Sequence, residues 1–88
     1  MGSLPINPFV HSVAVDTVNP KRVYAAGPAG LFRSDDAGQT WQAADEGLTG
    51  EPLAVVLDPA ASQTVFTVLT DDSVWRSQDG GTTWQPAE

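Results

Sequence analysis

Residues 34–41 read Ser-Asp-Asp-Ala-Gly-Gln-Thr-Trp, and 43 residues later residues 77–84 read Ser-Gln-Asp-Gly-Gly-Thr-Thr-Trp. Both copies fit the pattern Ser-x-Asp-x-Gly-x-Thr-Trp, and a glutamine follows each of them. The similarity continues upstream, where Arg33 matches Arg76 and, with one residue of slippage, the run 12–16 matches the run 54–58. The chain is therefore an internal repeat, which is the first feature to establish before any fold is considered.

Each copy of the repeat contains four predicted strands. They are expected at 12–15, 22–26, 31–34 and 40–43 in the first copy, and at 53–57, 64–69, 74–77 and 83–85 in the second. Pro, Gly, Asn or Asp bounds each run, and these residues favour turns. No segment keeps a helical apolar period over two turns, so no helix is expected. A repeat of this length with four short strands predicts an all-β fold of two four-stranded antiparallel propeller blades.

The doubled motif resembles the Asp-box, or bacterial neuraminidase repeat, of sialidases, sortilin-like receptors, some glucan hydrolases and photosystem assembly factors. The resemblance covers about 80 of the 88 residues and implies a β-propeller with the box between the third and fourth strands of each blade. We interpret the box as a structural clip. Its aspartate would accept backbone amide hydrogen bonds, its glycine would take a positive φ, its hydroxyls would close the turn, and its tryptophan would be buried between sheets. The residues in these roles are Ser34, Asp36, Gly38, Thr40, Trp41, Ser77, Asp79, Gly81, Thr83 and Trp84.

Composition and charge narrow the range of partners. Eleven acidic residues against four basic ones give a formal net charge of −7, which disfavours nucleic acid and anionic membranes as partners. The absence of cysteine and the single histidine, His11, disfavour disulfides and a structural zinc site. No apolar run is long enough to span a bilayer, and the N-terminus lacks the pattern of a signal peptide. We expect no metal and no cofactor, and the sequence does not indicate the cellular compartment.

A sialidase-like active site is the enzymatic alternative. By resemblance it would need three arginines around a carboxylate, a tyrosine nucleophile with its glutamate, and an acid/base aspartate. The chain has three arginines, but Arg33 and Arg76 are equivalent in the two repeats, which favours a repeated structural role such as an ion pair. Arg22 is expected to be solvated, and Tyr24 is matched by Phe66, which indicates core packing. We therefore expect the chain not to be an enzyme.

Two blades are too few to close a ring. The predicted layout is a linker at 1–10, blade 1 at 11–46, an inter-blade connection at 47–51 and blade 2 at 52–88. Each sheet face needs a neighbouring blade, and propellers have roughly four to eight blades. The sequence thus predicts a non-enzymatic building block that self-assembles, with a six-blade homotrimer ahead of an eight-blade tetramer. The alternative is a fragment of a larger Asp-box glycoside hydrolase or receptor without independent function, and whether the chain is natural, excised or designed stays open.

The loops opposite the boxes are acidic. In a ring they would repeat their carboxylates around a channel mouth, with Asp71 and Asp72 as the candidate residues for a cationic ligand or metal ion. The simpler reading is that these acids form a hydrophilic turn and confer solubility. No feature of the sequence identifies a natural ligand, a glycan included.

Overall fold

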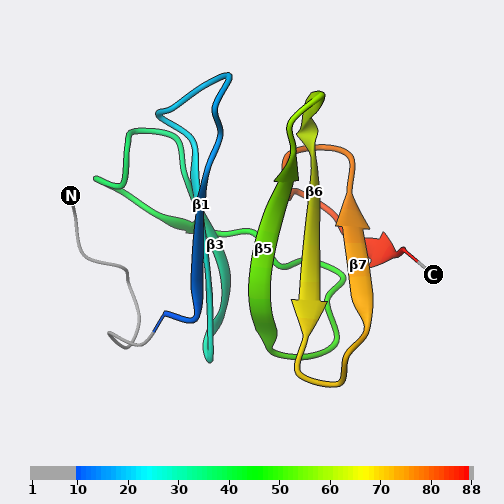
Figure 1. Ribbon diagram of the computed structural model, residues 1–88. Helices are drawn as coiled ribbons and strands as arrows, with labels where there is room; N and C mark the ends of the chain where they lie inside the picture. The colour runs from blue at the N-terminus through cyan, green and yellow to red at the C-terminus, as the bar shows by residue number, and fades with distance from the viewer. Residues whose placement is uncertain (1–9, 88) are drawn as a thin grey trace.

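The computed structural model describes residues 10–87, so that the predicted linker lies outside the described residues except for Val10. The chain forms two separate four-stranded antiparallel sheets, each in the order of the sequence (Figure 1). Blade 1 consists of β1 (Ser12–Val15), β2 (Val23–Gly27), β3 (Gly30–Ser34) and β4 (Gln42–Ala43). Blade 2 consists of β5 (Pro52–Asp58), β6 (Ala61–Leu69), β7 (Val74–Ser77) and β8 (Gln85–Pro86). The all-β prediction of two antiparallel blades is confirmed.

Six of the eight strands differ from their predicted bounds, three of them by two or more residues at one end. β4 and β8 contain two residues each, because the backbone amides of Thr40 and Thr83 donate to aspartate carboxylates instead of to a neighbouring strand. β6 starts three residues earlier than expected, because its hairpin with β5 continues to the pair Asp58–Ala61 past a β-bulge. The motif therefore shortens the outer strand of each blade.

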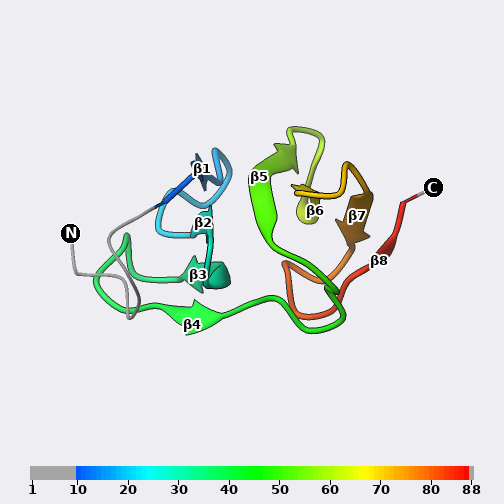
Figure 2. The same ribbon diagram turned by 90° about the horizontal axis from the view of Figure 1, so that it is seen from below.

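The two sheets pack against each other, chiefly through β1 and β2 of blade 1 and β5 of blade 2 (Figure 2). Tyr24, Leu31 and Val65 are fully buried, and fully burying such a side chain contributes roughly 1.5–3 kcal/mol. Both sheets supply the core between them, which consists of Tyr24, Ala26, Leu31, Ala44, Val55, Val65 and Trp84. We call this contact between the blades the internal joint.

Each blade also has a face that points away from the internal joint. Cross-strand partners share one face of a sheet, so the register defines both faces. Face A, on blade 1, consists of Val13, Val15, Val23, Ala25 and Phe32. Face B, on blade 2, consists of Ala54, Val56, Phe66, Val68 and Arg76. On face A, Val13 and Val15 are exposed while the other three residues are buried, and on face B Val56 is exposed.

Candidate functional site: the Asp-boxes and the joint between the blades

The box of blade 1 is organised around the carboxylate of Asp36. Its Oδ1 accepts the Ser34 hydroxyl at 2.7 Å and the Thr40 backbone amide at 2.8 Å, and its Oδ2 accepts the Thr40 hydroxyl at 2.5 Å. Ser34 Oγ in turn accepts the backbone amide of Gly38, which has a φ of 92°. All these bonds close within seven residues, so the carboxylate acts on its own turn.

The box of blade 2 repeats this arrangement. Asp79 Oδ1 accepts the Ser77 hydroxyl at 2.7 Å and the Thr83 amide at 2.9 Å, and Oδ2 accepts the Thr83 hydroxyl at 2.7 Å. Ser77 Oγ accepts the amide of Gly81, whose φ of 88° is one that side chains with a Cβ resist. Since both carboxylates are used in the same way inside their turns, this geometry fits a clip and leaves no observation that points to a ligand.

These hydrogen bonds make the boxes sensitive to acid. The Thr40 hydroxyl and amide and the Ser34 hydroxyl lower the pKa of Asp36 from 3.8 to about 2, and bonds from Thr83 and Ser77 lower the pKa of Asp79 to about 2 in the same way. A carboxyl group with a lower pKa in the folded state stabilises that state above its unfolded pKa, and the contribution is lost as the pH falls toward the folded pKa.

We therefore expect the urea midpoint of the chain to fall between about pH 4 and pH 2. The double variant Asp36→Asn/Asp79→Asn should be less stable at pH 7 and should change less over that pH range. Asp72→Asn, in an exposed turn, serves as the control. Equal acid sensitivity of the double variant and the wild type would contradict this assignment.

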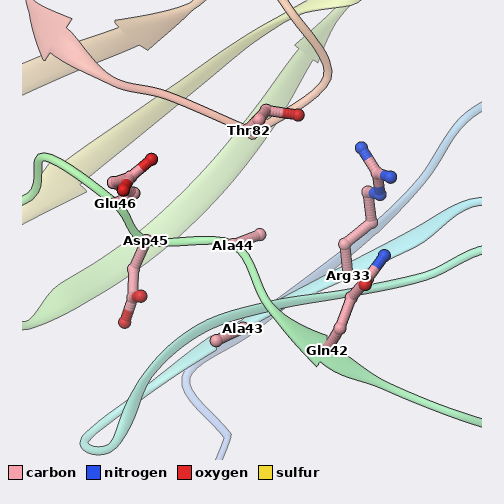
Figure 3. A pocket seen from close by; sticks show the side chains of 8 residues that line it. Arg33, Gln42, Ala43, Ala44, Asp45, Glu46 and Thr82 are labelled. Carbon is pink, nitrogen blue, oxygen red and sulfur yellow. The ribbon is translucent and has the colours of Figure 1, made fainter.

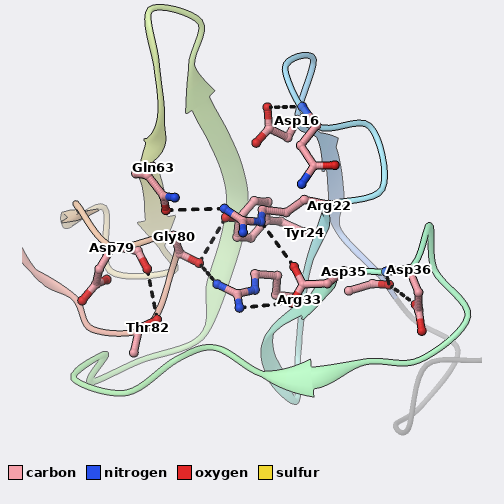
Figure 4. Close-up of polar contacts among 12 residues, drawn as sticks. Asp16, Arg22, Tyr24, Arg33, Asp35, Asp36, Gln63, Asp79, Gly80 and Thr82 are labelled. Carbon is pink, nitrogen blue, oxygen red and sulfur yellow. Dashed lines mark hydrogen bonds and ion pairs between the residues drawn. The ribbon is translucent and has the colours of Figure 1, made fainter.

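The box of blade 2 also forms part of the internal joint (Figure 4). The backbone carbonyl of Gly80 accepts the guanidinium of Arg33 at 2.6 Å and the hydroxyl of Tyr24 at 3.1 Å. Trp84 is 6% exposed, and its Nε1 donates to the carbonyl of Ala44 in blade 1 at 2.6 Å. A Cβ at Gly47 would lie 2.7 Å from the Trp84 carbonyl, so this connection needs glycine. Blade 1 thus forms hydrogen bonds to the turn of blade 2 that the Asp79 carboxylate stabilises.

The three arginines do not form one carboxylate-binding site. Arg22 was expected in solvent, and this is wrong: its Nε lies 3.3 Å from Asp35 Oδ1, and its NH1 lies 3.4 Å from Gln63 Oε1 (Figure 4). Arg33 lies beside it and also pairs with Asp35, at 3.2 Å. Arg76 lies on face B, on the other side of blade 2. Tyr24 is fully buried, and burial raises the pKa of its hydroxyl, which opposes use as a nucleophile.

The box tryptophans differ in their surroundings. Trp84 lies in the internal joint, whereas Trp41 is half-buried, and its Nε1 donates to Gly38 of its own box at 3.1 Å. The expectation that both rings are buried between sheets therefore holds for Trp84 within one chain, and for Trp41 it does not.

A cavity of about 400 Å³ lies at the rim of the internal joint (Figure 3). Its charged lining residues are Arg33, Asp45 and Glu46, and Thr82 faces them from the box of blade 2. Arg33 is already bonded to Gly80 and Asp35. Within residues 10–87 no three His, Cys, Asp or Glu side chains are grouped so that they could hold a metal ion.

The predicted acidic pair lies in the turn between β6 and β7. Asp71 Oδ1 accepts the Ser73 backbone amide at 3.0 Å and the Ser73 hydroxyl at 2.5 Å, and the pKa of Asp71 is lowered by these bonds. Asp72 has a φ of 69° in the same exposed turn. A ring of these carboxylates requires several copies of the chain, and it stays a prediction.

In the described part of the chain no helix is long and apolar enough to cross a membrane.

Comparison with known proteins identifies the repeats. The family model "BNR/Asp-box repeat" matches residues 32–43 and 75–86, which contain the two boxes. A vacuolar protein sorting/targeting protein 10 from Mycosarcoma maydis is 33% identical over 55 residues, which is 62% of this chain and 4% of that protein.

Solved structures show the same fold. An ancestral GH74 enzyme is similar with a TM-score of 0.81 at 22% identity, over 96% of this chain and 13% of its own. The GH74 enzyme of Niastella koreensis has a TM-score of 0.76 at 28% identity, over 89% of this chain and 14% of its own. YCF48 from Cyanidioschyzon merolae has a TM-score of 0.73 at 18% identity, over 96% of this chain and 25% of its own. The chain thus spans a small part of each of these relatives.

Proposed function

We propose that this chain, which carries two BNR/Asp-box repeats in two consecutive β-propeller blades, is a non-enzymatic building block that closes a propeller ring with further copies of itself. In this role it would serve as a scaffold or a binding module. The proposal concerns the 88-residue chain itself and not the activities of its larger relatives.

The exposure of equivalent residues carries this proposal. Val55 of β5 lies in the internal joint and is 4% exposed, whereas Val13, its equivalent in β1, lies on face A and is 56% exposed. On face B, Val56 is 59% exposed, whereas its equivalent Ala14 packs against the core. Faces A and B thus each present to water a valine whose equivalent in the other blade packs in the internal joint. Repeat units of this kind bury such faces by stacking on neighbours.

Ring size follows from the number of blades per chain. Propellers have roughly four to eight blades, so three copies would give six blades and four copies would give eight. Faces A and B are different surfaces, and a contact between two different surfaces produces a ring when the rotation closes and an open polymer when it does not. We favour the trimer over the tetramer.

The non-enzymatic part of the proposal rests on the positions of the candidate groups. Arg22 and Arg33 are held in the internal joint, and Arg76 lies on face B. The carboxylates of Asp36 and Asp79 are bonded inside their own turns. These residues support structure, and they do not converge on a place where a substrate could react.

Native mass spectrometry with light scattering on a sizing column tests the proposal. A trimer of one discrete mass is expected at micromolar concentration, and a discrete tetramer would also support ring closure. A monomer or a broad distribution would contradict the proposal. It would favour the alternative, a segment of a larger Asp-box glycoside hydrolase or receptor. That alternative is supported by coverage, because this chain matches only 4–14% of the length of the sorting protein and of the two GH74 enzymes.

A further inference from the structure

The internal joint provides a template for a contact between two copies. Several polar contacts cross it, and three of them end on a backbone carbonyl, whereas Arg22 donates to the Gln63 side chain and the Val55 amide to the Ser12 hydroxyl. Arg33 and Tyr24 donate to Gly80, and Trp84 donates to Ala44. An acceptor that belongs to the backbone is also present at the equivalent position of the other blade, whatever its side chain.

Backbone hydrogen bonds fix which residues are equivalent. The amide of Gly80 donates to Gln63 at 3.0 Å, and the amide of Ala37 donates to Lys21 at 2.8 Å in the same place of blade 1. Ala37 has a φ of 63° and Gly80 a φ of 70°, so the two turns have the same backbone conformation at this position. The alanine in the first box therefore presents its carbonyl as the glycine in the second box does.

The same argument applies at the outer edge of each blade. The amide of Ala44 donates to Leu31 at 2.7 Å, and the amide of Ala87 donates to Val74 at 2.9 Å. Ala87 is thus the equivalent of Ala44, whose carbonyl accepts the indole of Trp84.

The donors for a second joint are present on the open faces. Arg76 is paired with Phe66 across β6 and β7 as Arg33 is paired with Tyr24 across β2 and β3. Its Nε is buried without a hydrogen-bond partner among the described side chains, as is the Nε of Arg33, but Arg76 has no counterpart of the bond from Arg33 NH1 to the Gly80 carbonyl. Trp41 donates only to its own box.

We infer that face B of one copy binds face A of the next, with Arg76 donating to the Ala37 carbonyl and the Trp41 indole of the next copy donating to the Ala87 carbonyl. The inference rests on the proposed self-assembly and adds which surfaces meet and which residues carry the contact. The occupant of each face is a second copy, because faces A and B present the equivalents of the two sides that already meet in the internal joint.

The joint between copies is weaker than the internal joint. Phe66 lacks the hydroxyl with which Tyr24 binds the carbonyl of Gly80. Gln78 stands where Asp35 pairs with the arginines of blade 1, and Lys21 stands where Gln63 accepts from Arg22. Arg76 therefore lacks the carboxylate partner that Arg33 has. Assembly should accordingly depend on protein concentration at conditions under which each chain keeps its two blades.

Two pairs of matched variants test the contact by light scattering over a concentration series. Arg76→Met and Trp41→Phe should raise the concentration at which half the chains are assembled, about tenfold or more for Arg76→Met, because a hydrogen bond to a charged donor is lost. The equivalent changes Arg33→Met and Trp84→Phe should instead lower the urea midpoint of the chain at every concentration.

Phe66→Tyr is the opposite test. It adds the hydroxyl that Tyr24 has at the equivalent position, within reach of the Ala37 carbonyl of the next copy. This change should lower the half-assembly concentration several-fold. If the wild type forms a discrete ring and Arg76→Met, Trp41→Phe and Phe66→Tyr all leave that concentration unchanged, the inferred contact is wrong and the proposed function stands. A wild type that is monomeric at all concentrations would overturn both.

Discussion

Trp84→Ala should cost about 3–5 kcal/mol of the free energy of unfolding, the range for truncating a large aromatic residue in a core. Trp84 is 6% exposed between the two sheets, and its indole holds the carbonyl of Ala44. A small domain has only about 5–15 kcal/mol of total stability. Urea unfolding followed by far-UV circular dichroism should therefore show a variant that is largely unfolded or has a much lower midpoint.

Trp41→Ala is the matched control, because Trp41 occupies the same place in the first box and is half-buried. At a protein concentration below that of assembly it should lower the urea midpoint much less than Trp84→Ala. Equal losses from the two variants would contradict the assignment of Trp84 to the joint that holds the blades together.

Val56→Glu and Val13→Glu should each prevent ring formation while leaving the single chain folded. Val56 is 59% exposed on face B and Val13 is 56% exposed on face A, so a charged side chain can remain in water in the separate chain. In the ring the same carboxylate would be buried without a partner, which costs several kcal/mol. Light scattering should show a monomer for either variant where the wild type is assembled, at unchanged circular dichroism.

Mixing the two variants gives a sharper result. The Val56→Glu chain keeps an intact face A, and the Val13→Glu chain keeps an intact face B, so the mixture should form a dimer of one copy of each and nothing larger. Native mass spectrometry separates this outcome from a contact between identical faces, in which one variant alone would still form a homodimer. A homodimer of either variant would mean that the chains do not meet head to tail.

The fold could be predicted because the residues that determine each strand and each turn lie close together in the sequence and occur in both repeats. Runs such as 12–15 and 74–77 became β1 and β7 with the predicted bounds, since turn-forming residues follow each run, Asp16 after the first and Asp79-Gly80 shortly after the second. The two-residue lengths of β4 and β8 were not predicted. The threonine amide of each box could donate a hydrogen bond either to a neighbouring strand or to the aspartate carboxylate. It donates to the carboxylate because the turn is closed, which the sequence alone does not show.

Contacts across the internal joint could not be predicted from the repeat. Arg22 was expected to be solvated because it follows Lys21 at the start of a strand, and nothing in the sequence indicated its partner Gln63, which is 41 residues away. The match between Tyr24 and Phe66 suggested that the tyrosine hydroxyl has no role, yet it binds the carbonyl of Gly80. Residues that are equivalent in the repeat have different surroundings here, because one blade has a neighbour on a side where the other blade has none. The repeated Arg33 and Arg76 indicated a structural role, which was interpreted as an ion pair and not as a contact between blades.

The backbone carbonyl of Gly80 also bears on how such repeats can multiply. An arginine that binds a side chain would require that side chain to be kept in whichever blade comes next, so that both positions would have to change together. Here the acceptor belongs to the main chain of a turn that closes through its own serine, aspartate and threonine. A duplicated or exchanged blade therefore brings a compatible acceptor for this arginine with it, and the arginine contact places little restriction on the order in which blades of different sequence follow one another.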